Sequence, residues 1–181
     1  MAEPMEKPGS SSGKSVTSSF RISAEVYEIL QKDAMGKNIS LNSLVNHLLR
    51  RYSEFDMYMT RFKGVALTLR TFGNLMDNVG DDALTQIGSL AGAEVPKAMI
   101  SAMYGQANLE NAIKFLKLIA AHAANWRYSE APSEGGTTVV LAHDLGHKGS
   151  VFFSNYFDSM FKVMGISPQI SQTDQSVILR F

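Results

Sequence analysis

Three hydrogen-bonding side chains alternate along a short segment near the N-terminus: Thr17, Ser19 and Arg21. Side chains two positions apart lie on the same face of an extended strand, so these three lie together, and the mostly apolar side chains between them lie on the other face. An arginine can donate two hydrogen bonds to a guanine, and Ser and Thr hydroxyl groups can bond to either type of base. These residue types at this spacing are suited to contacting the edges of bases.

A strand and two helices are predicted to position these side chains. The strand is expected over residues 15–23, and the helices over residues 24–35 and 41–53. Ser23 and Ser40 stand directly before the two helices, where a serine hydroxyl group caps the free backbone N–H groups. The pattern therefore predicts a compact strand-helix-helix module.

The second predicted helix is strongly amphipathic. Its apolar side chains recur every three or four residues and share one face: Leu41, Leu44, Val45, Leu48, Leu49 and Tyr52. We expect the first helix to end at Gly36, because glycine readily adopts the left-handed conformation at a helix C-terminus. One copy of about 40 residues makes a marginal core and leaves its strand unpaired. Two copies would pair their strands and bury their helix faces against each other.

This order of elements resembles the ribbon-helix-helix family of DNA-binding regulators, of the Arc and MetJ type. The matching segments are residues 19–23 at the strand exit and residues 36–43 at the turn into the second helix, and the resemblance covers residues 15–53. It implies a homodimer that reads the major groove of double-stranded DNA with a two-stranded ribbon. The alternative is an ordinary strand-helix-helix segment within a larger domain.

The resemblance also implies which residues contact DNA. The outward strand residues would read base edges. The start of the second helix would hold a phosphate, where free backbone N–H groups form an anion site. Apart from the resemblance, Lys37 is a cation in the turn, and we expect it to bind DNA of any sequence. The expected DNA-binding residues are Thr17, Ser19, Arg21, Lys37, Ser40 and Asn42.

The charges are unevenly distributed. The whole chain has a net charge of zero, but residues 14–52 contain six basic and three acidic residues, whereas residues 53–181 contain ten basic and twelve acidic ones. A positive region in a neutral chain points to an anionic partner. The chain has no cysteine, which excludes disulfides and thiolate chemistry. Without an apolar signal segment or a run of membrane-spanning length, we expect a cytoplasmic protein.

A second string with the residue types for catalysis is His143-Asp144-Leu145-Gly146-His147. It resembles the metal-binding string of HD-type phosphohydrolases, in which a His-Asp pair, an upstream His and a downstream Asp hold a divalent metal that activates water. The resemblance implies a ligand set of His143 and Asp144 with His122 upstream and Asp158 or Asp174 downstream. One alternative is a turn between a strand and a helix, with Gly146 and Gly149 giving backbone freedom and Ser150 capping the helix. Another is a site that senses a small molecule or a metal. We expect the turn, and therefore no catalytic residue, metal or cofactor.

The rest of the chain is predicted to form a separate domain over residues 54–181, preceded by the module and by a flexible arm over residues 1–14. Strands are expected at residues 137–141 and 176–181, with a loop at 129–136. The predicted helices lie at residues 55–75, 82–90, after Pro96, 109–126 and 150–164, and Asn108 is the expected N-cap of the helix over 109–126. The expected fold class is mainly α with minor β.

We expect this second domain to be α+β and to regulate or assemble the dimer, either by binding a small-molecule effector or by building a higher oligomer. The predicted function is a sequence-specific transcriptional regulator and not an enzyme. An antitoxin is a further alternative, because many antitoxins share this type of DNA-binding module. Their partner-binding tails are short, whereas residues 54–181 have the composition of a folded domain.

Overall fold

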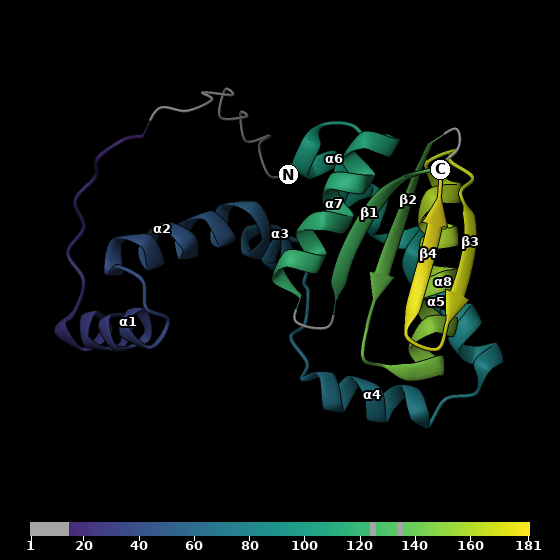
Figure 1. Cartoon of the computed structure of the whole chain (residues 1–181), viewed down its shortest axis with the longest axis horizontal. Coiled ribbons are helices and arrows are strands. Elements are labelled where there is room, and N and C mark those ends of the chain that lie inside the picture. Colours follow the sequence, from purple (N-terminus) through teal and green to yellow (C-terminus); the bar gives the residue numbers. More distant parts are fainter. Residues whose placement is uncertain (1–14, 124–125, 134–135) are drawn as a thin grey trace. The chain divides into compact units, whose positions relative to one another are not determined.

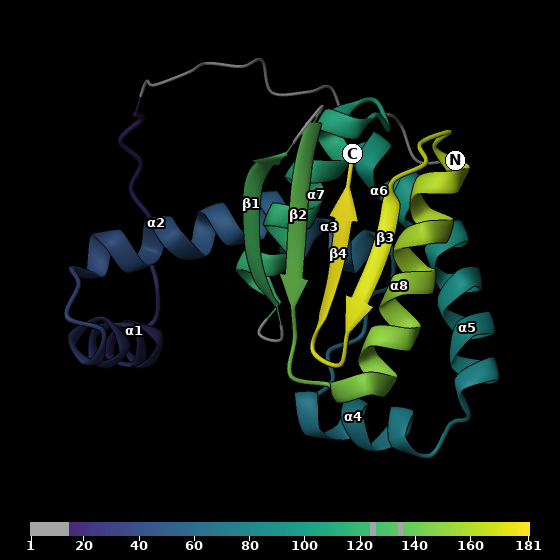
Figure 2. The ribbon, with the colours of Figure 1, turned by 45° about the vertical axis from the view of Figure 1, so that its right-hand side comes forward.

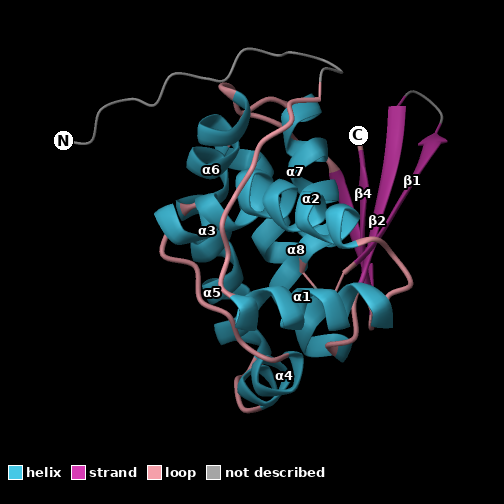
Figure 3. Cartoon of the chain, turned by 90° about the vertical axis from the view of Figure 1, so that its left-hand side faces the viewer, coloured by secondary structure: helices cyan, strands magenta, loops and turns pink. Residues whose placement is uncertain are grey.

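The computed structural model describes residues 15–123, 126–133 and 136–181, so the predicted flexible arm lies outside the described residues. The described chain is mainly helical with a small sheet, which confirms the predicted class of mainly α with minor β (Figure 3). None of the described helices is long and apolar enough to cross a membrane. The chain divides into two compact units, the first ending at Asn46 and the second spanning His47–Phe181.

The first unit contains helix α1 (Ala24–Gly36) and most of helix α2 (Leu41–Arg51). Both predicted serine caps are confirmed. Ser23 Oγ accepts a hydrogen bond from the backbone N–H of Val26 at 3.3 Å, and Ser40 Oγ accepts one from that of Ser43 at 3.1 Å. The predicted strand residues 15–23 have no regular secondary structure in the single chain.

The end of α1 differs from the prediction. Gly36 is helical, and the left-handed residue is Asn38, with φ of 55°. The backbone N–H groups of Asn38 and Ile39 donate to the carbonyl oxygens of Met35 and Ala34, each at 3.0 Å, which is the Schellman pattern of helix termination. Asparagine tolerates this conformation because its short polar side chain can bond locally. The assignment of Gly36 as the left-handed residue was therefore wrong.

The second unit begins with one continuous helical run. After α2 the chain forms a single π-helical turn, η1 (Tyr52–Asp56), and continues as α3 (Met57–Arg61). The predicted helix over residues 55–75 is interrupted, because residues 64–68 are irregular before α4 (Leu69–Asp77) begins.

The remaining helices follow the sequence prediction closely. They are α5 (Asp81–Glu94), α6 (Pro96–Tyr104), α7 (Leu109–His122) and α8 (Gly146–Val163). Asn108 caps α7 as expected, accepting the N–H of Asn111 at 2.9 Å. Helix α8 begins four residues before Ser150, so the predicted cap at Ser150 was wrong.

Four antiparallel strands form one sheet with the order β1-β2-β4-β3 (Figure 2). The strands are β1 (Arg127–Ser133), β2 (Gly136–Ala142), β3 (Gln169–Thr173) and β4 (Ser176–Arg180). The two predicted strands are confirmed as β2 and β4, and they pair directly in antiparallel register. Sequence analysis did not predict β3.

The loop predicted over residues 129–136 was wrong, because residues up to Ser133 belong to β1. Pro132 suggested a loop, since proline cannot donate a ladder hydrogen bond. Among the described residues, strand β1 lies at the edge of the sheet and pairs with β2 alone, and a proline is tolerated at such an edge.

The core of the second unit lies between one face of the sheet and the helices behind it (Figure 1). Alternate residues of the central strands are fully buried there, among them Val139, Leu141, Val177 and Leu179. They pack in one cluster with buried side chains of α6, α7 and α8, including Phe157.

Helix α5 packs on α8 at very short range. A Cβ atom added at Gly88 or Gly92 would collide with the backbone carbonyl group of Phe152 or Tyr156, respectively. The two glycines are four residues apart and share one face of α5. Their missing side chains let the two helix backbones touch.

Candidate functional site

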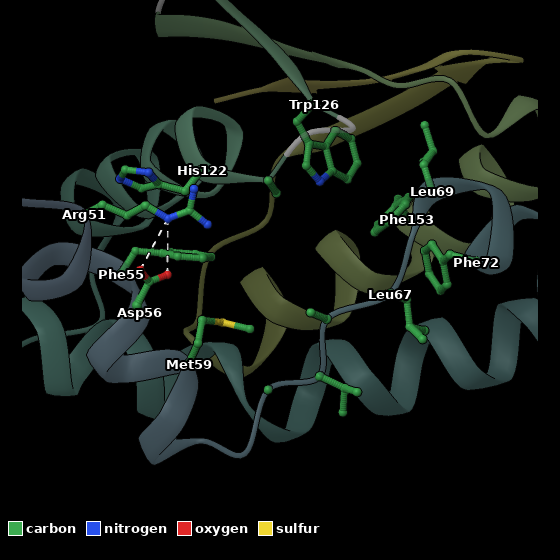
Figure 4. A pocket seen from close by; sticks show the side chains of 14 residues that line it. Arg51, Phe55, Asp56, Met59, Leu67, Leu69, Phe72, His122, Trp126 and Phe153 are labelled. Carbon is green, nitrogen blue, oxygen red and sulfur yellow. Dashed lines mark hydrogen bonds and ion pairs between the residues drawn. The ribbon is translucent and has the colours of Figure 1, made fainter. Parts of the chain in front are cut away.

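The second unit contains a pocket of about 530 Å³, a volume typical of small-molecule sites. Its walls come from the α2–η1–α3 run, the irregular residues 64–67, the end of α7 and the middle of α8. Figure 4 shows polar side chains at one end of this pocket and apolar ones at the other. We call these the polar end and the apolar end.

The polar end is built on the π-helical turn. Arg51 Nε lies 3.3 Å and 3.4 Å from the two carboxylate oxygens of Asp56. A π-helix bonds residues five apart, so these two side chains, five positions apart, come to lie together across the turn. In a regular α-helix the neighbours would be three or four apart.

The pairing with Asp56 leaves much of the Arg51 guanidinium unused. Among the described residues, no group bonds its terminal nitrogens Nη1 and Nη2. In Figure 4 these nitrogens point toward the open centre of the pocket. The polar end therefore presents two oriented nitrogen donors.

A histidine lies beside this ion pair. The ring of His122, the last residue of α7, lies 5.2 Å from the ring of Phe55, at an interplanar angle of 31°. Phe55 belongs to the π-helical turn, so this aromatic contact joins α7 to η1.

The apolar end is lined by aromatic and aliphatic side chains. The Trp126 and Phe153 rings meet edge to face, with centroids 4.4 Å apart. Phe72 of α4 and the exposed Leu67 complete this end, as Figure 4 shows. Trp126 is the only tryptophan in the sequence.

His143 of the possible metal-binding string points into the protein core. Its side chain is fully buried, its Nδ1 accepts the N–H of Leu145 at 3.3 Å, and its Nε2 lies 3.1 Å from Ser150 Oγ. Because Nδ1 accepts, the neutral ring carries its proton on Nε2 and donates to the serine. Burial lowers the pKa of His143 below its ordinary value of 6.5.

The other two polar residues of the string have separate partners. Asp144 accepts two hydrogen bonds from Arg127, at 2.9 and 3.0 Å, and this contact lowers the pKa of Asp144. His147 Nε2 lies 3.2 Å from Asp81, which Lys148 also contacts at 2.7 Å. The hydrogen bonds from Lys148 and His147 lower the pKa of Asp81.

The side chains of the string therefore have the contacts of a strand-to-helix turn. Gly146 adopts a positive φ of 62°, as expected for backbone freedom, whereas Gly149 lies inside α8, where a Cβ atom would collide with Leu145. Over the described ranges of the chain, no group of three or more His, Cys, Asp or Glu residues is arranged to hold a metal ion.

The predicted base-reading residues Thr17, Ser19 and Arg21 are exposed in the irregular segment before α1. They lie on a different segment from the predicted phosphate-binding residues, which follow α1.

Those phosphate-binding residues are partly engaged within the chain. Lys37 lies 2.6 Å from Asp33, Ser40 Oγ bonds to Ser43, and the carbonyl oxygen of Asn42 accepts from the Asn46 side chain at 2.9 Å. The side chain of Asn42 itself is exposed on the first turn of α2.

The first unit also exposes much apolar surface. Val16, Phe20 and Ile29 are 88 %, 70 % and 60 % exposed. On α2, Leu44 of the predicted apolar face is buried, whereas Leu48 and Leu49, which belong to the second unit, are exposed. Several large exposed apolar side chains in one small unit are a feature of protein interfaces.

Sequence analysis missed the pocket. The Arg51–Asp56 pair gives no helical signal, because its spacing of five fits neither face rule of an α-helix. Trp126 stands alone between a helix and a strand. No protein-family model, no curated protein and no solved structure matches this chain.

Proposed function

We propose that this protein is a sequence-specific DNA-binding transcriptional regulator that dimerises through residues 15–53. The observation that supports it most is the apolar surface of the first unit. Val16 and Phe20 in the irregular segment, and Ile29 on α1, are more than half exposed in the single chain. Covering exposed apolar side chains with a second copy would remove them from water and so stabilise a dimer.

The dimer would also supply the missing partner of the segment before α1. Residues 15–23 alternate hydrogen-bonding and mostly apolar side chains but have no strand partner in the single chain. In a dimer the two segments would pair antiparallel. Thr17, Ser19 and Arg21 would then lie on one outer surface, which fits the major groove.

The helix that follows provides the second element of DNA binding. The free N–H groups at the start of α2, beside Ser40 and Asn42, form an anion site for a phosphate. Lys37 would add attraction to DNA of any sequence, after exchanging its contact with Asp33 for one with a phosphate. The second unit would regulate or assemble this dimer.

The test combines mass and binding measurements on the full chain. Sedimentation at micromolar concentration should give a dimer. Selection from a random duplex library should yield a preferred site, and competition against random duplexes at fixed salt should give the specificity ratio. A folded monomer, or a selection that yields no preferred site, would overturn the proposal.

Two variants and one control separate base reading from contacts that bind DNA of any sequence. Arg21→Ala should cost about 1–3 kcal/mol at the preferred site and relax the preference at one base pair per half-site. The matched control is Lys32→Ala, which removes the same charge from an exposed position on α1. Asn42→Ala should instead weaken binding about equally on all sequences. An unchanged specificity ratio for Arg21→Ala would show that the ribbon does not read bases.

A further inference from the structure

We propose that the pocket of the second unit binds a small amphiphilic anion, with an apolar aromatic or aliphatic body and one carboxylate group. We further propose that this ligand changes the affinity of the protein for DNA, a step that rests on the proposed function. The body would lie at the apolar end and the carboxylate at the polar end of the pocket (Figure 4).

The apolar end sets the nature of the ligand body. The rings of Trp126, Phe153 and Phe72 offer apolar surfaces, against which an aromatic ring or an alkyl chain can pack. The volume of about 530 Å³ accommodates a body of one or two rings with a short side arm.

The polar end sets the charge of the ligand. Arg51 Nε donates to Asp56, which orients the guanidinium, and among the described residues no acceptor is hydrogen-bonded to Nη1 or Nη2. A planar carboxylate can accept hydrogen bonds from this pair of donors. A ligand cation has no such complement, because the nearby Asp56 already pairs with Arg51.

The position of Arg51 links the pocket to the DNA-binding module. Arg51 is the last residue of α2; at the other end of this helix, Ser40 stands directly before it and Asn42 lies in its first turn. The Arg51–Asp56 pair spans the π-helical turn, and such turns recur at functional sites. A ligand carboxylate that accepts from Nη1 and Nη2 would bring a second negative charge to the same guanidinium, beside Asp56. Its charge would therefore act on the ion pair that spans the turn continuing α2.

Binding is tested first without DNA. Trp126 is the only tryptophan, so its fluorescence reports on the apolar end directly. The probes are 1-naphthaleneacetate and decanoate, each compared with its neutral amide, and calorimetry gives the dissociation constants. Both anions should bind saturably with one site per chain, and each amide should bind at least about tenfold more weakly, since charged hydrogen bonds are the stronger ones.

Three variants test the placement. Arg51→Gln should weaken binding of both anions by about 10- to 100-fold and leave the amides nearly unchanged. The matched control is Arg50→Gln, which removes the same charge one residue earlier on α2, outside the pocket. Ala66→Phe, from the irregular wall, should block both anions and both amides by filling the pocket.

The outcomes separate the pocket from the proposed function. Absence of saturable binding by either anion, or equal loss in Arg50→Gln and Arg51→Gln, overturns the ligand site. If Arg51→Gln unfolds, Ala66→Phe alone decides whether the ligand occupies the pocket. Saturable binding with a DNA affinity that does not change overturns the coupling. Saturable binding by a protein that binds no DNA leaves the site in place and overturns the proposed function.

Discussion

The two units of this chain differ in how far their apolar side chains are buried. In the second unit, Phe157 and Leu141 are fully buried between helices and sheet. In the first unit, Phe20 and Ile29 are largely exposed, although the sequence places them in equally regular patterns. Only the second unit completes a core within one chain.

This difference marks the unit to which the proposed dimer interface is assigned. A unit with a complete core is stable at any concentration, whereas an apolar surface without a cover gains stability from association. Four predictions test the comparison, beginning with the largest expected effect.

The first concerns the complete core. Phe157→Ala should lower the free energy of unfolding of the second unit by about 3–5 kcal/mol, through lost burial and the cavity left behind. Denaturant unfolding at several protein concentrations measures it, and the loss should be the same at each. The control Leu90→Ala, at an exposed site on α5, should change it by less than about 0.5 kcal/mol. A loss that varies with concentration would contradict a self-contained core.

The second concerns the exposed surface. Ile29→Ala should weaken the dimer by about 1.5–3 kcal/mol, the value of burying one such side chain, or roughly 10- to 100-fold in dissociation constant. Sedimentation equilibrium over a dilution series measures it. Ile87→Ala, at a similarly exposed position on α5, should leave the dissociation constant unchanged. Equal effects of the two substitutions would remove the distinction between the two surfaces.

The third concerns the close contact of α5 and α8. Gly92→Ala should cost about 1–3 kcal/mol, because the added Cβ collides with the carbonyl group of Tyr156 and forces the helices apart. Gly73→Ala on α4 should have the opposite sign and stabilise by about 0.5–1 kcal/mol, since its Cβ meets only an ordinary contact with Leu145. Thermal unfolding distinguishes them. A neutral or stabilising effect of Gly92→Ala would mean that this glycine of α5 is not needed for packing.

The fourth concerns pH and should be the smallest. Burial lowers the pKa of His143 in the folded chain, whereas in the unfolded chain its pKa is near the ordinary value of 6.5. The unfolded state then binds more protons, so the free energy of unfolding should fall as the pH decreases below 6.5. His143→Gln should reduce this dependence, and His47→Gln, at an exposed site, should not. An unchanged slope in His143→Gln would place the pH dependence elsewhere.

The sequence determined most of the local structure. The helix caps at Ser23, Ser40 and Asn108 are confirmed. They could be predicted because capping needs only a side-chain oxygen and the backbone N–H group three residues later. The strands at residues 137–141 and 176–181 are confirmed for a similar reason, since runs of β-branched residues favour strands through neighbouring side chains. The mainly α class follows from these elements.

Tertiary structure decided the rest. The edge position of β1 makes Pro132 acceptable in a strand, and only the sheet order reveals that edge. The π-helical turn that joins Arg51 to Asp56 breaks the periodicity from which helix faces are predicted. The pocket gathers side chains from four separate stretches of chain. Local preferences act over a few residues, whereas such sites depend on packing between residues far apart in sequence, which no short pattern records.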